Sequence, residues 1–256
     1  MNSERFRHRL DLIAVFTQKE IKTRYRGTVL GYLWSLAHPL AFVAVFFLAF
    51  KTVMKVPVED YALFLAAGLF PWQWFSNSLI SASTVFVGNA ALLRKAAFPR
   101  NLLPLAVVLQ NMAHFLLSLP AIVLLLGLHG RAPSAAWLYG VPLAAAAQFL
   151  VTYGLALAVS SANVYLRDLE RLTGLAVWVL LYLTPVLYRE SMIPDRYRWI
   201  VHANPMAPVT IVWRNVLLEG GVPWAPLLLG LAHGTALAAV GHAVYRRLSW
   251  RIAELV

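Results

Sequence analysis

The stretch LLPLAVVLQNMAHFLLSLPAIVLLLGL, residues Leu102–Leu128, decides the class of fold to which this chain belongs. It carries no Asp, Glu, Lys or Arg, and most of its residues are Leu, Ala, Val or Ile. About 20 consecutive, predominantly apolar residues suffice for a helix to cross the hydrocarbon core of a bilayer. The stretch is therefore predicted to be a transmembrane helix.

Apolar residues are abundant along the rest of the chain as well. Hydrophobic residues make up 60% of its 256 residues and charged residues 13%, against about 45–50% and about 25% in soluble domains. Five more stretches are long and apolar enough to span a bilayer: residues 30–50, 61–82, 137–162, 172–188 and 225–245. We therefore expect an all-α, polytopic membrane protein in which six transmembrane helices form a single domain over residues 1–256.

The basic residues predict the orientation of these helices. With six spans, both termini lie on one side of the membrane; that side carries 15 of the 22 Lys and Arg residues and the opposite side 7. Cytoplasmic loops are the ones enriched in Lys and Arg. We therefore expect both termini in the cytoplasm, and we interpret the net charge of +11 as topology rather than as a sign of nucleic-acid binding.

The N-terminal segment, residues 1–29, has an amphipathic pattern. Phe6, Leu10, Ile13 and Phe16 recur at helical spacing among basic residues, which predicts a helix lying in the headgroup region of the membrane. A disordered basic tail is the alternative, and it would not need that spacing. The segment lacks the apolar core of a signal peptide, so we expect none.

A second segment, the loop 88–100, is predicted to lie in the cytoplasm. Asn89 can cap a short helix there, and Pro99 can end it. The helix would present apolar and basic residues side by side, as a docking helix does: Leu92, Leu93, Arg94 and Lys95. A solvated loop that merely satisfies the charge bias is the alternative, and composition does not decide between the two.

A third segment, residues 189–224, is predicted to lie on the outer side. It contains one apolar helical face that is too short to span: Val209, Val212, Trp213, Val216 and Leu217. Pro208 can begin this helix, and Gly220 with Gly221 can end it. Apolar segments of about 10–14 residues are typical of re-entrant or interfacial helices, so we expect short re-entrant helices before the last span.

The chain lacks the residues that would power transport by itself. None of its lysines follows a glycine, so the Gly-Lys-Ser/Thr loop that binds phosphates in many ATPases is absent. All eleven Asp and Glu residues lie outside the predicted spans, so no carboxylate is placed to couple transport to protons or sodium. We expect no catalytic residue, cofactor site or metal site in this chain.

One acidic pair deserves to be weighed as an enzymatic site. Asp168 and Glu170 form an Asp-x-Glu pair, faintly similar to the pair that holds a metal ion and a nucleotide-sugar in glycosyltransferases. Arg167 and Arg171 lie three residues from these carboxylates and can neutralise them on a helix surface. The loop is also only about ten residues long, far smaller than a catalytic domain, so a membrane glycosyltransferase is the weaker alternative.

Aromatic residues recur on one face of three predicted spans. Residues three, four or eight positions apart share a helix face, and seven rings have this spacing: Phe42, Phe46 and Phe50; Trp72 and Phe75; Trp178 and Tyr182. The C–H groups of a sugar pack well on the negative face of an aromatic ring. We therefore expect these rings to line a path for a glycan; packing between helices, or a place in the interfacial aromatic belt, is the alternative for each of them.

Three stretches carry a family resemblance that covers nearly the whole chain. They are IKTRYRGTVLGYLW at 21–34, LLRKAAFPRNLLPL at 92–105, and RDL at 167–169 followed by TPVLY at 184–188 and NP at 204–205. Together they resemble the permeases of bacterial ATP-binding-cassette (ABC) polysaccharide exporters, which export O-antigen, capsular polysaccharide and teichoic acid. Each stretch alone is a weak signal, but their order within a six-span layout is specific.

The resemblance implies a homodimer in the bacterial cytoplasmic (inner) membrane, with two ATPase subunits that bind ATP and Mg²⁺. It also implies a coupling helix that contacts the ATPase, here Asn89, Leu92, Leu93, Arg94, Lys95, Phe98 and Arg100. A charged cytoplasmic turn would lead into the fifth span: Arg167, Asp168, Glu170 and Arg171. The implied substrate is a lipid-linked polysaccharide of the O-antigen type, and export of teichoic acid or capsular polysaccharide, or efflux of drugs and other small molecules, are the alternatives.

Overall fold

The computed structural model of the chain describes residues 11–12, 14–18, 34–95 and 98–256. All regular structure in these residues is helical, without a β-strand, which confirms the all-α prediction for the described part. Most of the predicted N-terminal amphipathic helix lies outside the described residues, as do residues 21–33 of the first family stretch.

Among the described residues, three helices are long and apolar enough to cross a membrane. They are α6 (Leu102–Leu128), α7 (Trp137–Asn163), and α11 (Trp224–Leu248) together with the 3-10 helix η6 (Ser249–Arg251). Their bounds match the spans predicted at residues 102–128, 137–162 and 225–245 to within a few residues.

The helices of the other three predicted spans are partly polar, short or divided. The helix α3 (Tyr61–Ser83) has the expected length but carries Gln73, Ser76 and Asn77 in its second half. The helix α8 (Leu169–Leu183) has 15 residues and is about 22 Å long, shorter than the hydrocarbon core of about 30 Å. The first predicted span is divided between α2 (Trp34–Phe46) and the π-helix η2 (Phe47–Val53). The total of six spans therefore stays a prediction.

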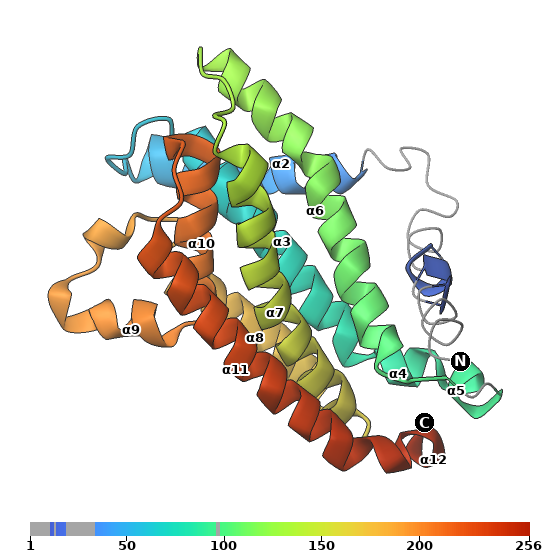
Figure 1. Ribbon diagram of the computed structural model, residues 1–256. Helices are drawn as coiled ribbons and strands as arrows, with labels where there is room; N and C mark the ends of the chain where they lie inside the picture. Colours follow the sequence, from blue (N-terminus) through green and yellow to red (C-terminus); the bar gives the residue numbers. More distant parts are fainter. Residues whose placement is uncertain (1–10, 13, 19–33, 96–97) are drawn as a thin grey trace.

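Figure 1 shows α3, α6, α7, α8 and α11 running alongside one another, with α2 and η2 crossing them. One end of this bundle holds three short helices, α4 (Val85–Gly88), α5 (Ala90–Lys95) and α12 (Ile252–Leu255), together with the C-terminus. The helix α9 (Arg198–Ala203) projects to the side of the bundle. The end with α5 and α12 is the one for which the basic residues predict a cytoplasmic location.

The most extensive helix–helix contact joins α7 and α11. A methyl group at Gly154 on α7 would overlap the backbone of Leu237 and Ala238 on α11, and one at Gly241 would overlap the backbone of Gly154. Small residues let two helix backbones approach closely, which maximises dispersion contacts where no hydrophobic effect favours association. Glycine is therefore required at this seam for packing.

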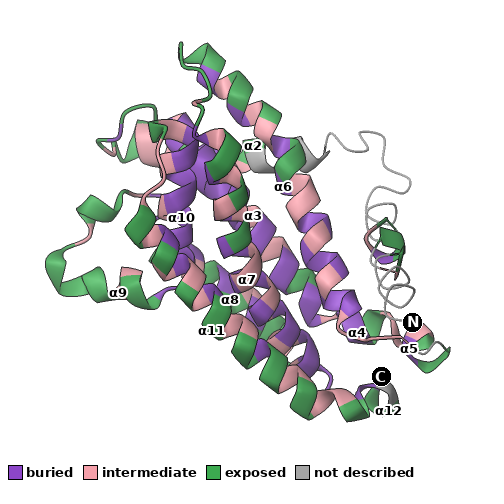
Figure 2. Cartoon of the chain, in the orientation of Figure 1, coloured by how far each residue is buried: buried purple, intermediate pink, exposed green. Residues whose placement is uncertain are grey.

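The helix α10 (Met206–Arg214) is inserted against α3, α7 and α11, and Figure 2 shows it largely in the colour of buried residues. The apolar face predicted for it is buried throughout: Val209, Val212, Trp213, Val216 and Leu217. The predicted start at Pro208 is wrong by two residues. The side-chain oxygen of Asn204 accepts a hydrogen bond of 2.9 Å from the backbone N–H of Met206 and starts the helix earlier.

The end of this helical segment matches the prediction. After α10 the chain continues as the π-helix η5 (Asn215–Glu219), and Gly220 follows with φ of +75°. This left-handed conformation has little cost for glycine and a steric cost for residues with a Cβ. Gly220 therefore ends the helix and turns the chain toward α11.

Candidate functional site

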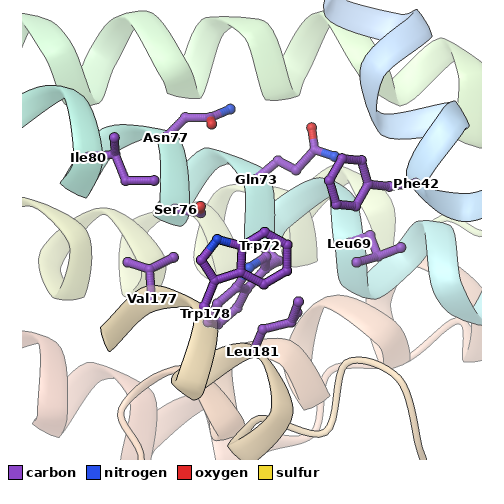
Figure 3. A pocket seen from close by; sticks show the side chains of 10 residues that line it. All are labelled: Phe42, Leu69, Trp72, Gln73, Ser76, Asn77, Ile80, Val177, Trp178 and Leu181. Atoms are coloured by element: carbon purple, nitrogen blue, oxygen red, sulfur yellow. The ribbon is translucent and has the colours of Figure 1, made fainter. Parts of the chain in front are cut away.

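A cavity of about 210 Å³ lies between α2, α3 and α8. Ten residues line it: Phe42, Leu69, Trp72, Gln73, Ser76, Asn77, Ile80, Val177, Trp178 and Leu181. Figure 3 shows the amides of Gln73 and Asn77 on one side of the cavity and the indole rings of Trp72 and Trp178 on the other. One wall of the cavity is therefore aromatic and another can form hydrogen bonds.

Three of the seven aromatic residues predicted to line a path meet in this cavity: Phe42, Trp72 and Trp178. Trp72 is almost completely buried, whereas half of Trp178 is exposed. Phe42, Phe46 and Phe50 form a ladder, with ring centroids 6.0 Å apart at each step, so they share one face as their spacing predicts.

The remaining aromatic residues lie outside the cavity lining. Phe75 is fully buried, and its ring centroid lies 5.2 Å from that of Trp72, so the two rings pack against each other. Tyr182 lies one helical turn beyond Trp178 and is about half exposed. That all seven line one channel stays a prediction.

The polar residues of the cavity were not predicted from the sequence. Gln73, Ser76 and Asn77 lie three and four positions apart on α3, so they share a face. The side-chain nitrogen of Gln73 is buried and has no hydrogen-bond partner among the residues that the structure describes. Polar side chains at helical spacing inside an apolar span are costly toward lipid and mark functional surfaces, so this spacing was the available signal.

The predicted coupling helix corresponds to α5, which begins directly after Asn89 as expected. The backbone carbonyl of Asn89 accepts hydrogen bonds from the N–H groups of Leu92 and Leu93, while its side chain donates to the carbonyl of Val85 on α4. The helix extends to Lys95, and residues 96–97 lie outside the described part. Asn89 thus connects α4 to α5 as well as starting α5.

The residues of α5 face in different directions. Leu93 is buried within the chain, Leu92 is half-buried, and Arg94 and Lys95 are exposed. Arg94 nevertheless donates two hydrogen bonds to the carbonyl oxygen of Val256.

Two further residues of this loop have contacts within the chain. Arg100 donates a hydrogen bond to the carbonyl oxygen of Ser249. The ring of Phe98 lies 5.2 Å from that of Phe16, which is buried and belongs to the described part of the N-terminal segment. Much of the predicted docking loop is therefore held by the chain itself.

The predicted charged turn lies at the same end: Arg167 and Asp168 precede α8, and Glu170 and Arg171 belong to its first turn. All four of its charged residues are exposed: Arg167, Asp168, Glu170 and Arg171. No salt bridge joins them in the described structure, and no group of His, Asp and Glu that could hold a metal ion occurs in the described ranges. The turn is tied to its neighbours by Tyr165, whose hydroxyl donates to the carbonyl of Leu248 at 2.8 Å.

The stretch Thr184–Tyr188, singled out for its resemblance, follows α8 and is held at its backbone by side chains from other elements. Arg214 donates to the carbonyls of Pro185 and Val186 at 2.9 and 3.2 Å, and Tyr61 donates to the carbonyl of Leu187 at 2.7 Å. Asn204 donates to the hydroxyl of Thr184 at 2.8 Å. The last two parts of the third stretch, residues 184–188 and 204–205, thus form one hydrogen-bonded unit.

Arg214 is the most deeply buried charged residue of this unit. Its guanidinium lies 3.6 Å from the centroid of the Phe64 ring, in a favourable cation–π position. Burial lowers the pKa of Arg214 to about 9, and the nearby carboxylate of Glu190 opposes this shift. Arg214 on α10 therefore stays protonated at neutral pH and anchors the end of α8 as a cation.

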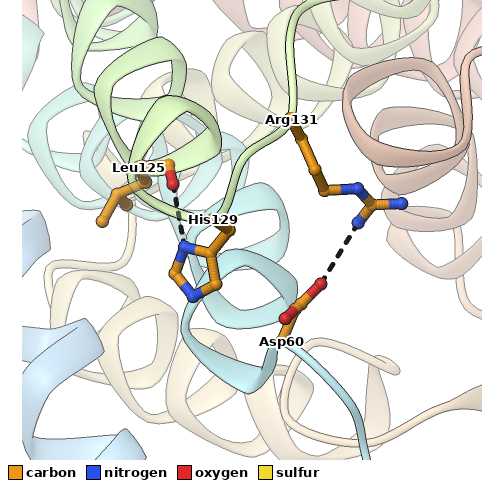
Figure 4. Close-up of polar contacts among 4 residues, drawn as sticks. All are labelled: Asp60, Leu125, His129 and Arg131. Atoms are coloured by element: carbon orange, nitrogen blue, oxygen red, sulfur yellow. Dashed lines mark hydrogen bonds and ion pairs between the residues drawn. The ribbon is translucent and has the colours of Figure 1, made fainter.

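A second contact closes the same end of the bundle. Figure 4 shows Arg131, just after α6, in an ion pair of 3.4 Å with Asp60, which precedes α3. The ring of His129 hydrogen-bonds to the carbonyl of Leu125 at 2.9 Å near the end of α6. Both side chains of the ion pair are nearly half exposed, so this pair is worth about 0–1 kcal/mol.

Comparisons with known proteins identify relatives of this chain. Residues 11–218 match the family model described as ABC-2 type transporter. Two Klebsiella pneumoniae proteins named "O-antigen export system permease protein RfbA" are each 39% identical over 246 residues, covering 96% of this chain and 95% of the relative. A Myxococcus xanthus protein of the same name is 32% identical over 224 residues, covering 86% and 85%. The chain belongs to the ABC-2 type transporter family of membrane proteins.

Proposed function

We propose that this chain is the permease subunit of an ABC exporter that moves a lipid-linked, O-antigen-like polysaccharide across the bacterial inner membrane. The observation that carries the proposal is the cavity in which the indole rings of Trp72 and Trp178 lie opposite the amides of Gln73 and Asn77. Sugars present both C–H faces, which stack on aromatic rings, and hydroxyl groups, which need hydrogen-bond partners. A cavity with both kinds of wall fits a glycan better than a purely apolar drug.

The names of the relatives favour the same substrate class. The Klebsiella and Myxococcus proteins are named as O-antigen export permeases, and the first of them aligns with nearly the whole chain. This supports O-antigen over teichoic acid or capsular polysaccharide.

The proposal includes an assembly of four chains and assigns no reaction to this one. Two copies of the chain form the membrane part, each with six spans and both termini in the cytoplasm, and two ATPase subunits bind ATP and Mg²⁺. The lack of a phosphate-binding loop supports placing ATP hydrolysis on the partner. The basic residues at the end that holds α5 support placing the ATPase there.

Within this assembly, α5 is the coupling helix. Lys95 is exposed and Leu92 is half-buried, so these two residues are available to the ATPase, whereas Leu93 packs inward. The exposed turn with Arg167 and Asp168 lies at the same end and forms a second contact.

Deletion of the gene tests the proposal directly. Surface O-antigen should be lost while lipid-linked polysaccharide accumulates inside the cell, and a separate ATPase subunit should co-purify with the tagged chain from wild-type membranes. Normal surface polysaccharide in the deletion strain would refute the export function.

Substitutions in the cavity test its role. Trp178→Leu and Asn77→Leu should lower surface polysaccharide while protein level and ATPase activity of the complex stay normal, because each removes one kind of sugar contact. Trp224→Leu is a matched control, since Trp224 is exposed at the start of α11. Equal effects of Trp178→Leu and Trp224→Leu would count against a sugar path through the cavity.

Labelling tests the orientation, and the chain is convenient for this because it contains no cysteine. A cysteine at Ser191 should react with a membrane-impermeant thiol reagent from the periplasmic side, whereas one at Glu254 should not; both positions are exposed. Reaction at Glu254 from outside would contradict cytoplasmic termini.

A further inference from the structure

Three side chains from two distant segments of the sequence donate hydrogen bonds to the last residue of α11 and to the residues that follow it. The carbonyl of Leu248 accepts from Tyr165, and the carbonyl of Ser249 accepts from Arg100. The backbone oxygen of Val256 accepts from two nitrogens of Arg94, at 2.8 Å from Nε. The loop between α4 and α6 and the turn between α7 and α8 therefore converge on residues 248–256.

These bonds have a clear physical cause. The last carbonyls of a helix lack partners within the helix, and Arg side chains near a helix C-terminus satisfy them and interact favourably with its dipole. Apolar contacts add to the bonds: Leu93, Ile252 and Val256 are all buried, and α12 packs against α5.

The helix α5 needs such support. It has six residues, far fewer than the roughly 12–15 at which an isolated helix becomes even marginally stable in water. A helix this short is rigid only when tertiary contacts hold it. It can transmit movement to the rest of the protein only if it is rigid. Residues 249–256 supply these contacts, and they directly follow the last residue of α11.

We propose that residues 249–256 act as a strut that locks the coupling helix α5 to α11, with Arg94 and Arg100 as positioning residues. This inference rests on the proposed function, because it assumes that an ATPase moves α5. Since α11 packs backbone to backbone against α7, movement of α5 is transmitted through the strut to the α7–α11 pair.

The strut assigns Arg94 a role different from direct docking. A docking arginine would have its guanidinium free for the ATPase, whereas here two of its nitrogens bind Val256 of the same chain. The two roles predict the same loss of export for Arg94→Gln but differ in what restores it.

The first experiment measures polysaccharide exported per ATP hydrolysed by the complete transporter, permease with its ATPase, in reconstituted vesicles. Arg94→Gln should lower this ratio about tenfold while ATP hydrolysis continues, because charge-assisted hydrogen bonds are the stronger ones. Arg94→Lys keeps a charged donor and should retain more than a third of the ratio. Arg247→Gln is the matched control, since Arg247 is exposed at the end of α11, and it should leave the ratio unchanged.

The second experiment separates the strut from direct docking. Cysteines replace Arg94 and Val256 in the otherwise cysteine-free chain, and a short bifunctional thiol reagent joins them. The strut predicts a low ratio before cross-linking and a ratio restored to at least half of the wild-type value afterwards. Failure of the cross-link to restore export would show that Arg94 acts on the ATPase and would overturn the strut.

Two other outcomes are decisive. An unchanged ratio in Arg94→Gln, in a wild-type complex that exports polysaccharide, would overturn the strut alone. A wild-type chain that binds no ATPase and exports no polysaccharide would overturn the proposed function, and the strut with it.

Discussion

Helices α7 and α8 follow one another in the chain, yet they pack in opposite ways. The helix α7 lies against α11 with glycine at the contact, so the two backbones touch. The helix α8 contacts the rest of the chain along one narrow strip, Thr173, Val177 and Leu181, and exposes Leu172, Leu175 and Val179. The α7–α11 pair is thus built as a scaffold, whereas α8 keeps one side open.

The difference separates the part of the protein that stabilises the fold from the part that holds the cavity. Close backbone contact leaves no room for substitution and fixes the position of α10, which packs on both α7 and α11. The cavity lies on the other side, between α2, α3 and α8, where burial is incomplete. A permease needs both parts, a rigid frame and a face that lipid, substrate or a second copy can meet.

The largest expected effect comes from adding one methyl group at the seam. Gly154→Ala should destabilise the protein by about 3 kcal/mol, the upper end of the usual cost of overpacking, because the new Cβ would overlap the backbone of α11. Gly174→Ala on α8 is the matched control: nothing lies within 4 Å of its Cβ position, and alanine should stabilise this helix by about 0.5–1 kcal/mol. Thermal unfolding in detergent measures the stability of both variants. Equal changes in stability would show that α7 and α8 do not differ in how closely they pack.

The next effect concerns the buried polar contact that joins the scaffold to α10. Gln148 on α7 donates to the carbonyl of Pro71 at 2.7 Å and accepts from the Trp213 indole at 2.6 Å. Gln148→Leu leaves both groups unpaired and should cost about 1–3 kcal/mol. The double variant Gln148→Leu, Trp213→Phe should cost less than the sum of the single variants; strict additivity would show that the bond contributes nothing.

A smaller effect is expected at the end of α8. Arg214→Lys should lower the free energy of unfolding by about 1–2 kcal/mol, since a lysine cannot reproduce the two carbonyl contacts together with the stacking on Phe64. Arg131→Lys, at the half-exposed ion pair with Asp60, serves as control and should change stability by less than about 0.5 kcal/mol. A larger loss of stability for Arg131→Lys than for Arg214→Lys would show that the buried contacts of Arg214 are not the main interaction that holds the end of α8.

The smallest effect is expected on the open side of α8. Leu175→Ala should change the stability of a single copy by less than about 0.5 kcal/mol, because 62% of Leu175 is exposed. If two copies meet at this face, the same substitution should weaken the dimer while leaving the monomer intact. Analytical size-exclusion chromatography at several protein concentrations separates the two effects.

Much of this architecture can be predicted from the sequence alone. Long apolar stretches predict α6, α7 and α11 within a few residues, and the spacing of Val209, Val212, Trp213, Val216 and Leu217 predicts the buried face of α10. Helical periodicity also places Phe42, Phe46 and Phe50 on one face. These are local properties, because a helix in a membrane forms its own backbone hydrogen bonds.

Long-range partners were decided by the tertiary structure alone. Pairing of Arg94 with Val256, of Arg214 with the turn after α8, and of Gly154 with Gly241 joins residues that no periodicity connects. The early start of α10 at Met206 has the same origin, since it depends on the side chain of Asn204 and the turn it forms with Thr184. Sequence by itself determined the long helices α6, α7 and α11, the apolar face of α10 and the family, because these follow from hydropathy and spacing along one segment. The partners, the cavity and the strut were decided by the fold, because each requires side chains from segments that only packing brings together.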